Sequence, residues 1–371
     1  MFDSLNLKPE AFGLDISDLS LKIAKLKKKG KFLSLDAFGE TEIAPGIISE
    51  GEIKDVKSLS KIIKEATRNT QGKLKTKYVN CSLPEEKSFL QVIRLPKMKE
   101  VDMKKAAYFE AENYVPVSVD QLYLDSQKIT PTKNNLDHSD VLIAALPKKI
   151  VNPYLSCLKE AGLKPLAFEI ESQAITRALI KNEFSPSPIL LIDLGATRTS
   201  FIVFSGYSVR FTGSISTSSQ KFTEAIAQNL KINTTKAEYL KLKYGLREKI
   251  KNKKKSKKEK SEVFEALVPM LTDFVEQINK YLNYYQTHSF HEHLPESNKK
   301  LAKIFLSGGG SNLKGLIEFL SLELKIPVEL ASPWVNILPK PLKEVPALPF
   351  EESLGYTTAL GLALRDIKNN D

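Results

Sequence analysis

The chain repeats one short pattern about half its length apart, and this duplication limits its fold more than any other feature does. Residues 12–17 read FGLDIS and residues 190–195 read LLIDLG, so each is an apolar strand that ends in Asp-x-(small residue). A polar turn and a second apolar strand follow in both places. This internal repeat predicts two similar α/β lobes, and a nucleotide held between the two turns is the natural use of that symmetry.

The lobes are expected to meet at a Ser-Pro-Ser-Pro stretch over residues 185–188. Predicted strands and helices alternate on both sides of it, which favours the α/β class. Each lobe is also expected to carry an inserted subdomain. The predicted subdivision is lobe I over 1–187 with an insertion at about 84–147, and lobe II over 188–371 with an insertion at about 216–300 that contains the basic loop 247–260.

The formal net charge of +11 comes mostly from one segment. Residues 247–260, REKIKNKKKSKKEK, contain nine basic and two acidic residues, a net charge of +7. We expect a solvated, disordered loop there, with contact to anionic lipid headgroups or to an acidic partner as the alternative. No aromatic residues are interleaved for base stacking, so nucleic acid is not an expected partner.

The cysteines and the N-terminal sequence indicate a cellular compartment. Cys81 and Cys157 lie far apart in the chain, which favours two reduced, buried thiols in a reducing environment. The first residues lack the apolar core of a signal peptide, and no run approaches the roughly 18 apolar residues that cross a bilayer. We therefore expect a soluble cytoplasmic protein.

Two further features are weak candidates for sites. His288, His291 and His293 follow a predicted helix end in a polar loop without a nearby cysteine, so we do not expect them to bind a metal. Trp334 is the only tryptophan, and we expect it to be a surface-packed aromatic rather than a partner contact.

Several segments spread over most of the chain carry a family resemblance. They read FGLDISDLSLKIAKL, APGIISEGEIKD, KMKEVDMKKAAYFEAENYVPVSVDQLYLD, LIDLGATRTSFIVFSG, QKFTEAIAQNLKINTTKAEYLKLKYGL, FVEQINKYLNYY, IFLSGGGSNLKGL and LGYTTALGLALR. In this order and spacing they resemble the PilM family of type IV pilus assembly and twitching motility. That family is similar to FtsA and belongs to the actin-like ATPase superfamily. The resemblance implies an actin-like, two-lobed fold of duplicated ribonuclease H-like lobes, with a nucleotide cleft and an FtsA/PilM-type inserted subdomain.

The resemblance implies an ATP or ADP site with Mg²⁺. Asp15 and Asp193 match two aspartates that hold hydrated Mg²⁺ from opposite lobes, a role that suits an ion which keeps most of its waters. The alternative for each is that it caps a turn. The implied nucleotide-binding residues are Asp15, Ser17, Lys22, Asp193, Gly195, Ser218, Ser219, Glu238, Lys241, Gly308, Gly309, Gly310 and Asn312.

Some of these residues have plain structural alternatives. Glu238 and Lys241 could form an ordinary surface ion pair three residues apart on a helix. Lys22 could simply point outward from an edge strand. Glu171 matches a position that orients the attacking water in some superfamily members, and it could equally be an acidic residue in the first turn of a helix.

Three departures from the family pattern surround the implied phosphate site. Ser17 replaces a usual glycine and Asp18 a usual serine, and Ser218-Ser219 stand where Gly-Gly is typical. A carboxylate about 5 Å from a phosphate would cost about 3 kcal/mol at an effective dielectric constant near 20, unless its rotamer points away. We therefore expect weakened ATP–Mg²⁺ binding and at most slow ATP hydrolysis.

The implied function is an interaction scaffold. It would dock the cytoplasmic N-terminal tail of a PilN-like inner-membrane protein, contact other pilus assembly components, and lie at the inner face of the cytoplasmic membrane through these partners or, weakly, through the basic loop. Self-association is left open. The alternatives are an FtsA-like cell-division filament protein, disfavoured because the sequence shows no amphipathic targeting helix after Arg365, and a sugar-kinase-type phosphotransferase, for which no sugar-site motif occurs.

Overall fold

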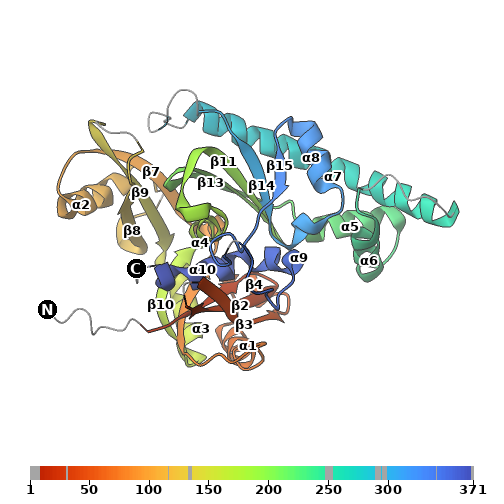
Figure 1. Ribbon diagram of the computed structural model, residues 1–371, viewed down its shortest axis with the longest axis horizontal. Helices are drawn as coiled ribbons and strands as arrows, with labels where there is room; N and C mark the ends of the chain where they lie inside the picture. The colour runs from red at the N-terminus through yellow and green to blue at the C-terminus, as the bar shows by residue number, and fades with distance from the viewer. Residues whose placement is uncertain are drawn as a thin grey trace. The chain divides into compact units, whose positions relative to one another are not determined.

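The protein folds into two compact α/β units, each built on a mixed five-stranded sheet (Figure 1). A computed structural model describes residues 9–30, 32–115, 117–132, 136–246, 254–288, 294, 299–339 and 341–368. Unit 1 comprises Met1–Ser185, Gly206–Val209 and Ser332–Asp371, and unit 2 comprises Pro186–Ser205 and Arg210–Ala331.

The sheet of unit 1 has the strand order β10-β6-β1-β2-β3. The central strand β1 pairs antiparallel with β2 and parallel with β6, and β10 continues the parallel side. Helices α1, α3 and α4 belong to the same unit. The bounds are β1 Phe12–Ile16, β2 Ser20–Lys29, β3 Phe32–Glu42, α1 Val56–Ala66, β6 Tyr78–Leu83, α3 Lys148–Glu160, β10 Lys164–Ile170 and α4 Glu171–Leu179.

The sheet of unit 2 repeats this plan with the order β13-β12-β11-β14-β15. Its central strand β11 pairs parallel with β14, which pairs parallel with β15. The two central strands, β1 and β11, are the two copies of the sequence repeat, so the duplication correctly predicted paired α/β lobes. The bounds are β11 Ser185–Leu194, β12 Thr199–Gly206, β13 Ser208–Ile215, β14 Lys303–Ser307 and β15 Val328–Leu330.

Unit 1 carries the predicted inserted subdomain, a three-stranded sheet of order β7-β9-β8 covered by α2 (Figure 1). The buried side chains that join them include Ile93, Met103 and Ile143. α2 also has apolar residues on its outer face, where Val101 and Phe109 are each 68% exposed. The bounds are β7 Phe89–Pro96, α2 Glu100–Ala111, β8 Leu122–Lys128 and β9 His138–Pro147.

In the described part of the segment between β13 and β14, unit 2 has the helices α5 (Ser219–Leu230), α6 (Thr234–Tyr244) and α7 (Lys254–His288). α7 begins earlier than expected, because residues 254–260 of the predicted disordered loop are helical. That stretch contains no glycine or proline, and lysine is a good helix former, so nothing local ends the helix there. Residues 247–253 lie outside the described residues.

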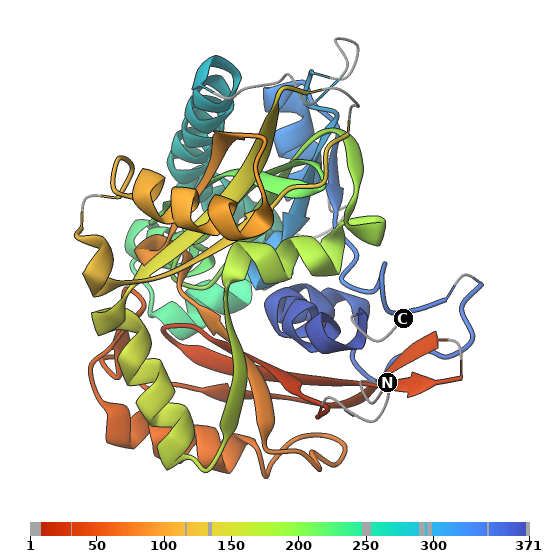
Figure 2. The same cartoon turned by 90° about the vertical axis from the view of Figure 1, so that its left-hand side faces the viewer.

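The C-terminal residues belong to unit 1, whereas the sequence had placed them in lobe II. The reason is the packing of α10 (Thr357–Lys368) against β1, β2 and α4, visible in Figure 2. A Cβ added at Gly13 of β1 would collide with the Ala359 carbonyl oxygen, and one added at Gly361 would collide with the Ala174 carbonyl oxygen. Two glycines thus let the backbones of three elements approach one another.

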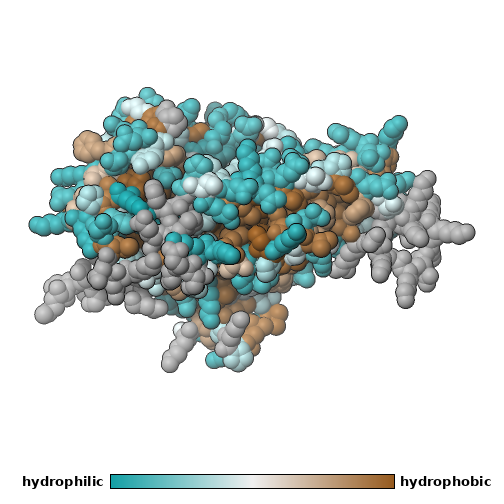
Figure 3. All heavy atoms as spheres, turned by 90° about the horizontal axis from the view of Figure 1, so that it is seen from above, coloured by the Kyte–Doolittle hydropathy of each residue, from teal (hydrophilic) through white to brown (hydrophobic). Residues whose placement is uncertain are grey.

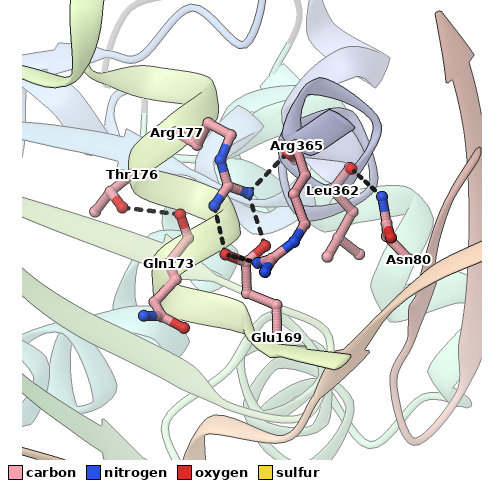
Figure 4. Close-up of polar contacts among 8 residues, drawn as sticks. Asn80, Glu169, Gln173, Thr176, Arg177, Leu362 and Arg365 are labelled. Carbon is pink, nitrogen blue, oxygen red and sulfur yellow. Dashed lines mark hydrogen bonds and ion pairs between the residues drawn. The ribbon is translucent and has the colours of Figure 1, made fainter. Parts of the chain in front are cut away.

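A buried ion cluster also fixes α10 to unit 1 (Figure 4). Glu169 of β10 is 4% exposed and pairs with the guanidinium of Arg177 on α4 and, at 2.9 Å, with that of Arg365 on α10. Arg177 also donates to the Gly361 carbonyl over 3.1 Å. The cluster therefore joins two consecutive elements, β10 and α4, to α10, which lies far from both in the chain.

The remaining elements include β4 (Ile48–Ser49), β5 (Glu52–Ile53), α8 (Leu316–Leu324) and α9 (Phe350–Ser353), and short 3₁₀ turns η2 (Glu85–Lys87) and η6 (Gly309–Asn312). Trp334 is 7% exposed and packs in the core with α10, so it is a core residue rather than a surface aromatic. Cys81 and Cys157 are free, buried thiols, as predicted. None of the helices in the described ranges has the length and apolar composition of a membrane span.

Candidate functional site

Asp15 is the expected Mg²⁺ residue of unit 1, and a hydrogen-bond network fixes its carboxylate near the end of β1. The Ser82 hydroxyl donates to Asp15 Oδ1 over 2.9 Å, and the Ile16 amide donates to Ser82 Oγ over 3.0 Å. Burial raises the pKa of Asp15, while the charge of Lys22 and the bond from Ser82 act in the opposite direction. A cation would favour the ionised form, so this carboxylate suits one.

Lys22 lies opposite Asp15 in the β1–β2 register. Its ammonium forms an ion pair with Glu40 over 3.0 Å and donates to Ser20 Oγ over 2.8 Å. The side chain is therefore anchored within unit 1 by an acid and a hydroxyl. Its contact with a phosphate stays a prediction.

Ser17 begins the turn after β1 without needing the flexibility of glycine. Its amide donates to the Ser20 carbonyl over 2.9 Å, and its hydroxyl donates to the same oxygen over 2.9 Å. Its φ is not in the left-handed region that favours glycine. The serine is thus compatible with a closed turn, although its Cβ occupies space that a glycine would leave empty.

Asp18 binds the turn between β4 and β5. Its Oδ2 accepts from the Glu50 amide over 3.1 Å and its Oδ1 from the Gly51 amide over 2.9 Å. Both residues have positive φ, 51° and 73°, so their successive amides form the kind of concave nest that binds anions. Tyr154 donates to the Gly51 carbonyl over 3.0 Å, and a Cβ at Gly51 would lie 2.5 Å from Pro84 Cβ.

This geometry changes the electrostatic part of the expected weakening. The expected loss of binding free energy came from repulsion between the Asp18 carboxylate and a phosphate. It would arise only if the carboxylate pointed toward that phosphate. The Asp18 carboxylate is instead bound by two backbone amides of its own unit. The sequence did not predict these bonds, which connect Asp18 to amides 32 and 33 positions later in the chain. No local sequence signal connects the two turns.

In unit 2, Asp193 lies opposite Ser307 in the β11–β14 register. Gly195 follows it and begins a turn in which its amide donates to the Arg198 carbonyl over 2.9 Å. A Cβ added at Gly195 would lie 2.9 Å from that carbonyl oxygen. The turn after Asp193 therefore requires a residue without a side chain unless the backbone shifts.

The first turn of α5 is already hydrogen-bonded within the chain. The amides of Ser219 and Gln220 donate to the carbonyls of Gly195 and Ala196, each over 3.0 Å. Ser218 is the N-cap, and its hydroxyl accepts from the amide three residues later over 3.4 Å. A phosphate bound at this helix end would have to displace these bonds or accept hydrogen bonds from the serine hydroxyls.

Lys241 is a buried lysine, 4% exposed, that binds the start of α5. Its ammonium donates to the Ser219 carbonyl over 2.9 Å and to the Ser219 and Thr223 hydroxyls over 2.8 Å each. It also pairs with Glu238 over 2.8 Å, and Thr223 bonds the same carboxylate. Burial lowers the pKa of Lys241, against the effect of Glu238. The expected ion pair three residues apart is therefore present, with Glu238 partly exposed, and its lysine is buried and also links α6 to α5.

The three glycines after β14 have different surroundings. Gly308 has a φ of 82°, and a Cβ there would lie 2.5 Å from the Leu194 carbonyl oxygen. A Cβ at Gly310 would lie 2.6 Å from Leu194 Cγ, whereas one at Gly309 would meet nothing within 4 Å. Asn312 donates to the Gly309 carbonyl over 3.3 Å. Two glycines thus serve close packing, and Gly309 alone leaves open space.

These contacts bring the predicted residues of unit 2 together. The end of β11, the turn at Gly195, the start of α5, α6 and the loop after β14 are linked by direct bonds or close packing. The role of these residues in nucleotide binding stays a prediction. The residues concerned are Asp193, Gly195, Ser218, Ser219, Glu238, Lys241, Gly308, Gly309, Gly310 and Asn312.

Glu171 opens α4 in unit 1, as expected. The buried Glu85 carboxylate accepts from the next amide, that of Ser172, over 3.0 Å. Glu85 was missed as a capping group, although an acidic pair directly after Pro84 and a buried strand was a signal. A catalytic role for Glu171 stays a prediction.

The candidate metal residues fit a water-rich ion. Within the described residues, no three His, Cys, Asp or Glu side chains gather into a group that could hold a metal. Mg²⁺ keeps most of its coordination positions for water and needs few protein carboxylates, whereas structural zinc sites are filled by protein ligands. His288 stacks on Tyr284 and lies 2.7 Å from the Thr287 hydroxyl, and His291 and His293 lie outside the described residues.

Comparison with known proteins gives a family match over almost the whole chain. The family model described as "Type IV pilus assembly protein PilM" matches residues 13–367. A solved structure of a PilM–PilN type IV pilus biogenesis complex is similar at 26% sequence identity, with a TM-score of 0.78, over 97% of this chain and 99% of that chain.

Two more distant structures share the actin-like fold. MreB 5 of Spiroplasma citri, bound to AMPPNP, is 14% identical with a TM-score of 0.55, and the match covers 98% of each chain. The MamK double helical filament is 11% identical with a TM-score of 0.52, over 96% of this chain and 98% of that chain. At these identities the likeness shows the fold alone.

Proposed function

The chain belongs to the type IV pilus assembly protein PilM family, and from that premise we propose that it is an actin-like scaffold of pilus assembly. It docks the cytoplasmic N-terminal tail of a PilN-like inner-membrane protein and so works at the inner face of the cytoplasmic membrane. The observation that carries the proposal is the similarity to PilM of a PilM–PilN complex, which extends over 97% of this chain.

The inserted subdomain supports a docking role for unit 1. It is a complete small sheet with its own apolar core, not a loose loop, so the chain maintains a second folded surface beside the five-stranded sheet. Capture of an extended tail needs strand-edge backbone groups and pockets for alternate side chains. The edge strands of the small sheet, β7 and β8, would offer the first of these.

The proposal includes an ATP–Mg²⁺ site, for which Asp15 and Asp193 are the candidate metal residues. Asp15 and Asp193 would hold hydrated Mg²⁺, which supplies charge neutralisation to the phosphates when bound. The engaged amides of α5 and the Lys241 link to Ser219 support weak binding. The direction of Asp18 removes one reason for weakness, so the expected weakening now rests on the side chain of Ser17 and on unit 2.

The partner is tested by isothermal titration of the full chain with a synthetic peptide of the PilN-like tail. A scrambled peptide of the same composition is the control. Micromolar or tighter binding of the native peptide, with none of the scrambled one, is the expected result. Equal binding of both peptides, or of neither, would overturn the docking proposal.

The nucleotide site is tested by titration with ATP–Mg²⁺ and by phosphate release. Weak binding that Asp193→Asn removes, with slow or undetectable hydrolysis, is expected. A Ser17→Gly, Asp18→Ser double variant should not bind much more tightly, because Asp18 faces amides rather than the phosphate. Clear tightening in that variant would restore the original electrostatic explanation, and tight binding by the natural chain would contradict a weakened site.

A further inference from the structure

The tip of the β2–β3 hairpin and the loop over 341–347 form one surface on unit 1, which we name the hairpin-tip surface. Lys29 of the hairpin pairs with Glu344 of the loop over 2.7 Å. Lys343 lies over the Phe32 ring, with its Nζ 5.6 Å from the ring centroid. Figure 2 shows the loop running beside the ends of these two strands. Segments more than 300 positions apart are therefore joined at this place.

The loop is held at both ends and exposed between them. Ile337 and Leu348, 3% and 1% exposed, are part of the core that contains α10. Between these anchors, Leu342 and Val345 are 55% and 80% exposed. The residues between these two, Lys343 and Glu344, contact the hairpin. The two exposed aliphatic side chains therefore lie on either side of the place where the loop is attached to the hairpin.

Exposed apolar side chains alone do not mark an interface. The face drawn in Figure 3 also carries hydrophobic residues beside hydrophilic ones, and such exposure is normal for a folded protein. What distinguishes the hairpin-tip surface is that its aliphatic residues occur together with a group of lysines. We therefore ask which partner would favour exposed aliphatic side chains and lysines on the same surface.

The charge of the surface is positive and comes from lysine alone. It includes four lysines, Lys27, Lys28, Lys29 and Lys343. Lys27 pairs with Asp36 and Lys29 pairs with Glu344. Arginine, which recognises carboxylates through paired bonds, is absent from residues 27–36 and 341–347 of the sequence. Lysine is depleted at protein–protein interfaces, whereas its point charge suits the diffuse field of anionic headgroups.

We propose that the hairpin-tip surface binds an anionic phospholipid membrane. Leu342 and Val345 insert among the headgroups, and the lysines lie against the lipid phosphates. An interface with a folded protein would need a contiguous patch of about 800 Å², whereas a bilayer accepts separate protruding side chains. This contact goes beyond the proposed function, because it requires neither the tail of a partner nor a nucleotide.

The experiment is co-sedimentation of the full chain with vesicles of pure phosphatidylcholine and of phosphatidylcholine mixed with phosphatidylglycerol. Binding to the mixed vesicles only is expected, and it should decrease with salt because exposed charges are screened. The double variant Leu342→Ser, Val345→Ser should bind about tenfold more weakly, because the free energy gained by removing the two apolar side chains from water is lost. Lys27→Gln with Lys28→Gln should weaken binding by about fivefold for each lysine removed.

Leu322→Ser is the matched control, because Leu322 is a 74% exposed leucine on α8 of unit 2. It should bind vesicles like the natural chain. Equal binding to both vesicle types, or none to either, would overturn the proposal. So would full binding by the Leu342, Val345 variant, which would assign the contact to another surface such as the basic segment 247–260. Stronger binding to duplex DNA than to the mixed vesicles would identify a nucleic-acid surface instead.

Discussion

The turns that follow the two aspartates have the same backbone hydrogen bond but hold different residues. In unit 1 the Ser17 amide donates to the Ser20 carbonyl over 2.9 Å, and in unit 2 the Gly195 amide donates to the Arg198 carbonyl over 2.9 Å. Unit 1 accommodates a side chain there and uses its hydroxyl for a second bond. The duplicated frame therefore does not itself demand a glycine.

The loops that follow β6 and β14 differ more. After β6 the chain continues as Pro-Glu-Glu, and the Glu85 carboxylate caps α4 while Asp18 holds the neighbouring turn. After β14 it continues as Gly308 to Gly310, and two of these glycines pack on the Leu194 backbone and side chain. In unit 1 the loop after β6 is thus fixed by carboxylates that accept from backbone amides. In unit 2 the loop after β14 is fixed by close packing of its backbone.

The largest expected change in the free energy of unfolding is in unit 2, at the glycine loop after β14. Gly308→Ala should destabilise the chain by about 3 kcal/mol or more, because the new Cβ meets a backbone oxygen and φ is 82°. Gly309→Ala is the matched control and should change the free energy of unfolding by less than about 1 kcal/mol, since its Cβ meets nothing. Denaturant unfolding measures both. Similar losses in the two variants would show that close packing does not explain the loop.

The next largest loss of stability is expected in unit 1, at Asp18. Asp18→Ala removes two bonds to backbone amides and should cost about 2 kcal/mol. Proteolysis should then become faster at the Glu50–Gly51 turn, which loses its anchor. Asp125→Ala, at an exposed aspartate bonded only to the adjacent amide, is the control and should cost less than about 0.5 kcal/mol. An equal loss in the control would remove any special role for Asp18.

A pH series tests the state of Asp15. Because burial raises its pKa in the folded chain, the folded state binds a proton more readily than the unfolded state. The stability that this group contributes therefore falls as pH rises from the ordinary value of 3.8 through the raised value. Asp15→Asn should be more stable than the natural chain at neutral pH, and the advantage should vanish below pH 3.8. An advantage that does not vary with pH would refute burial as its cause.

The smallest expected effect is at the serine itself. Ser17→Gly removes a hydroxyl bond and adds backbone freedom, so it should cost about 0.5–1 kcal/mol. The reverse change, Gly195→Ser, should cost more, because its Cβ would lie 2.9 Å from the Arg198 carbonyl oxygen. Thermal unfolding of both variants compares the two turns directly. A larger loss from Ser17→Gly would show that the close contact at Gly195 does not decide the difference between the turns.

The frame of this fold could be predicted because its signals are local. The repeated strands ending in Asp15 and Asp193, the glycines after a buried strand, and the acid that opens α4 are all visible in short windows of sequence. Each follows from strand or helix geometry and from the steric freedom of glycine. The candidate residues of unit 2, by contrast, came from the family resemblance, and their role in nucleotide binding stays a prediction.

The missed features depend on contacts between distant residues. Asp18 bonds residues of another turn, Lys241 is buried against Ser219, and α10 returns to unit 1. A single sequence does not show which amide a carboxylate will face, or whether a lysine on a helix will be covered by its neighbour. The early start of α7 was missed for a different reason, because a run of lysines was interpreted as a loop although lysine favours helices.

The return of α10 to unit 1 has a consequence for how the protein is made. A ribosome synthesises all of unit 2 before it reaches Thr357, so unit 2 can fold while the chain is still growing. The β1 strand of unit 1, synthesised first, must wait for one of the last helices to cover Gly13. During that interval its apolar surface is available to chaperones. Translation order therefore favours a folded unit 2 attached to an incomplete unit 1 as the nascent intermediate.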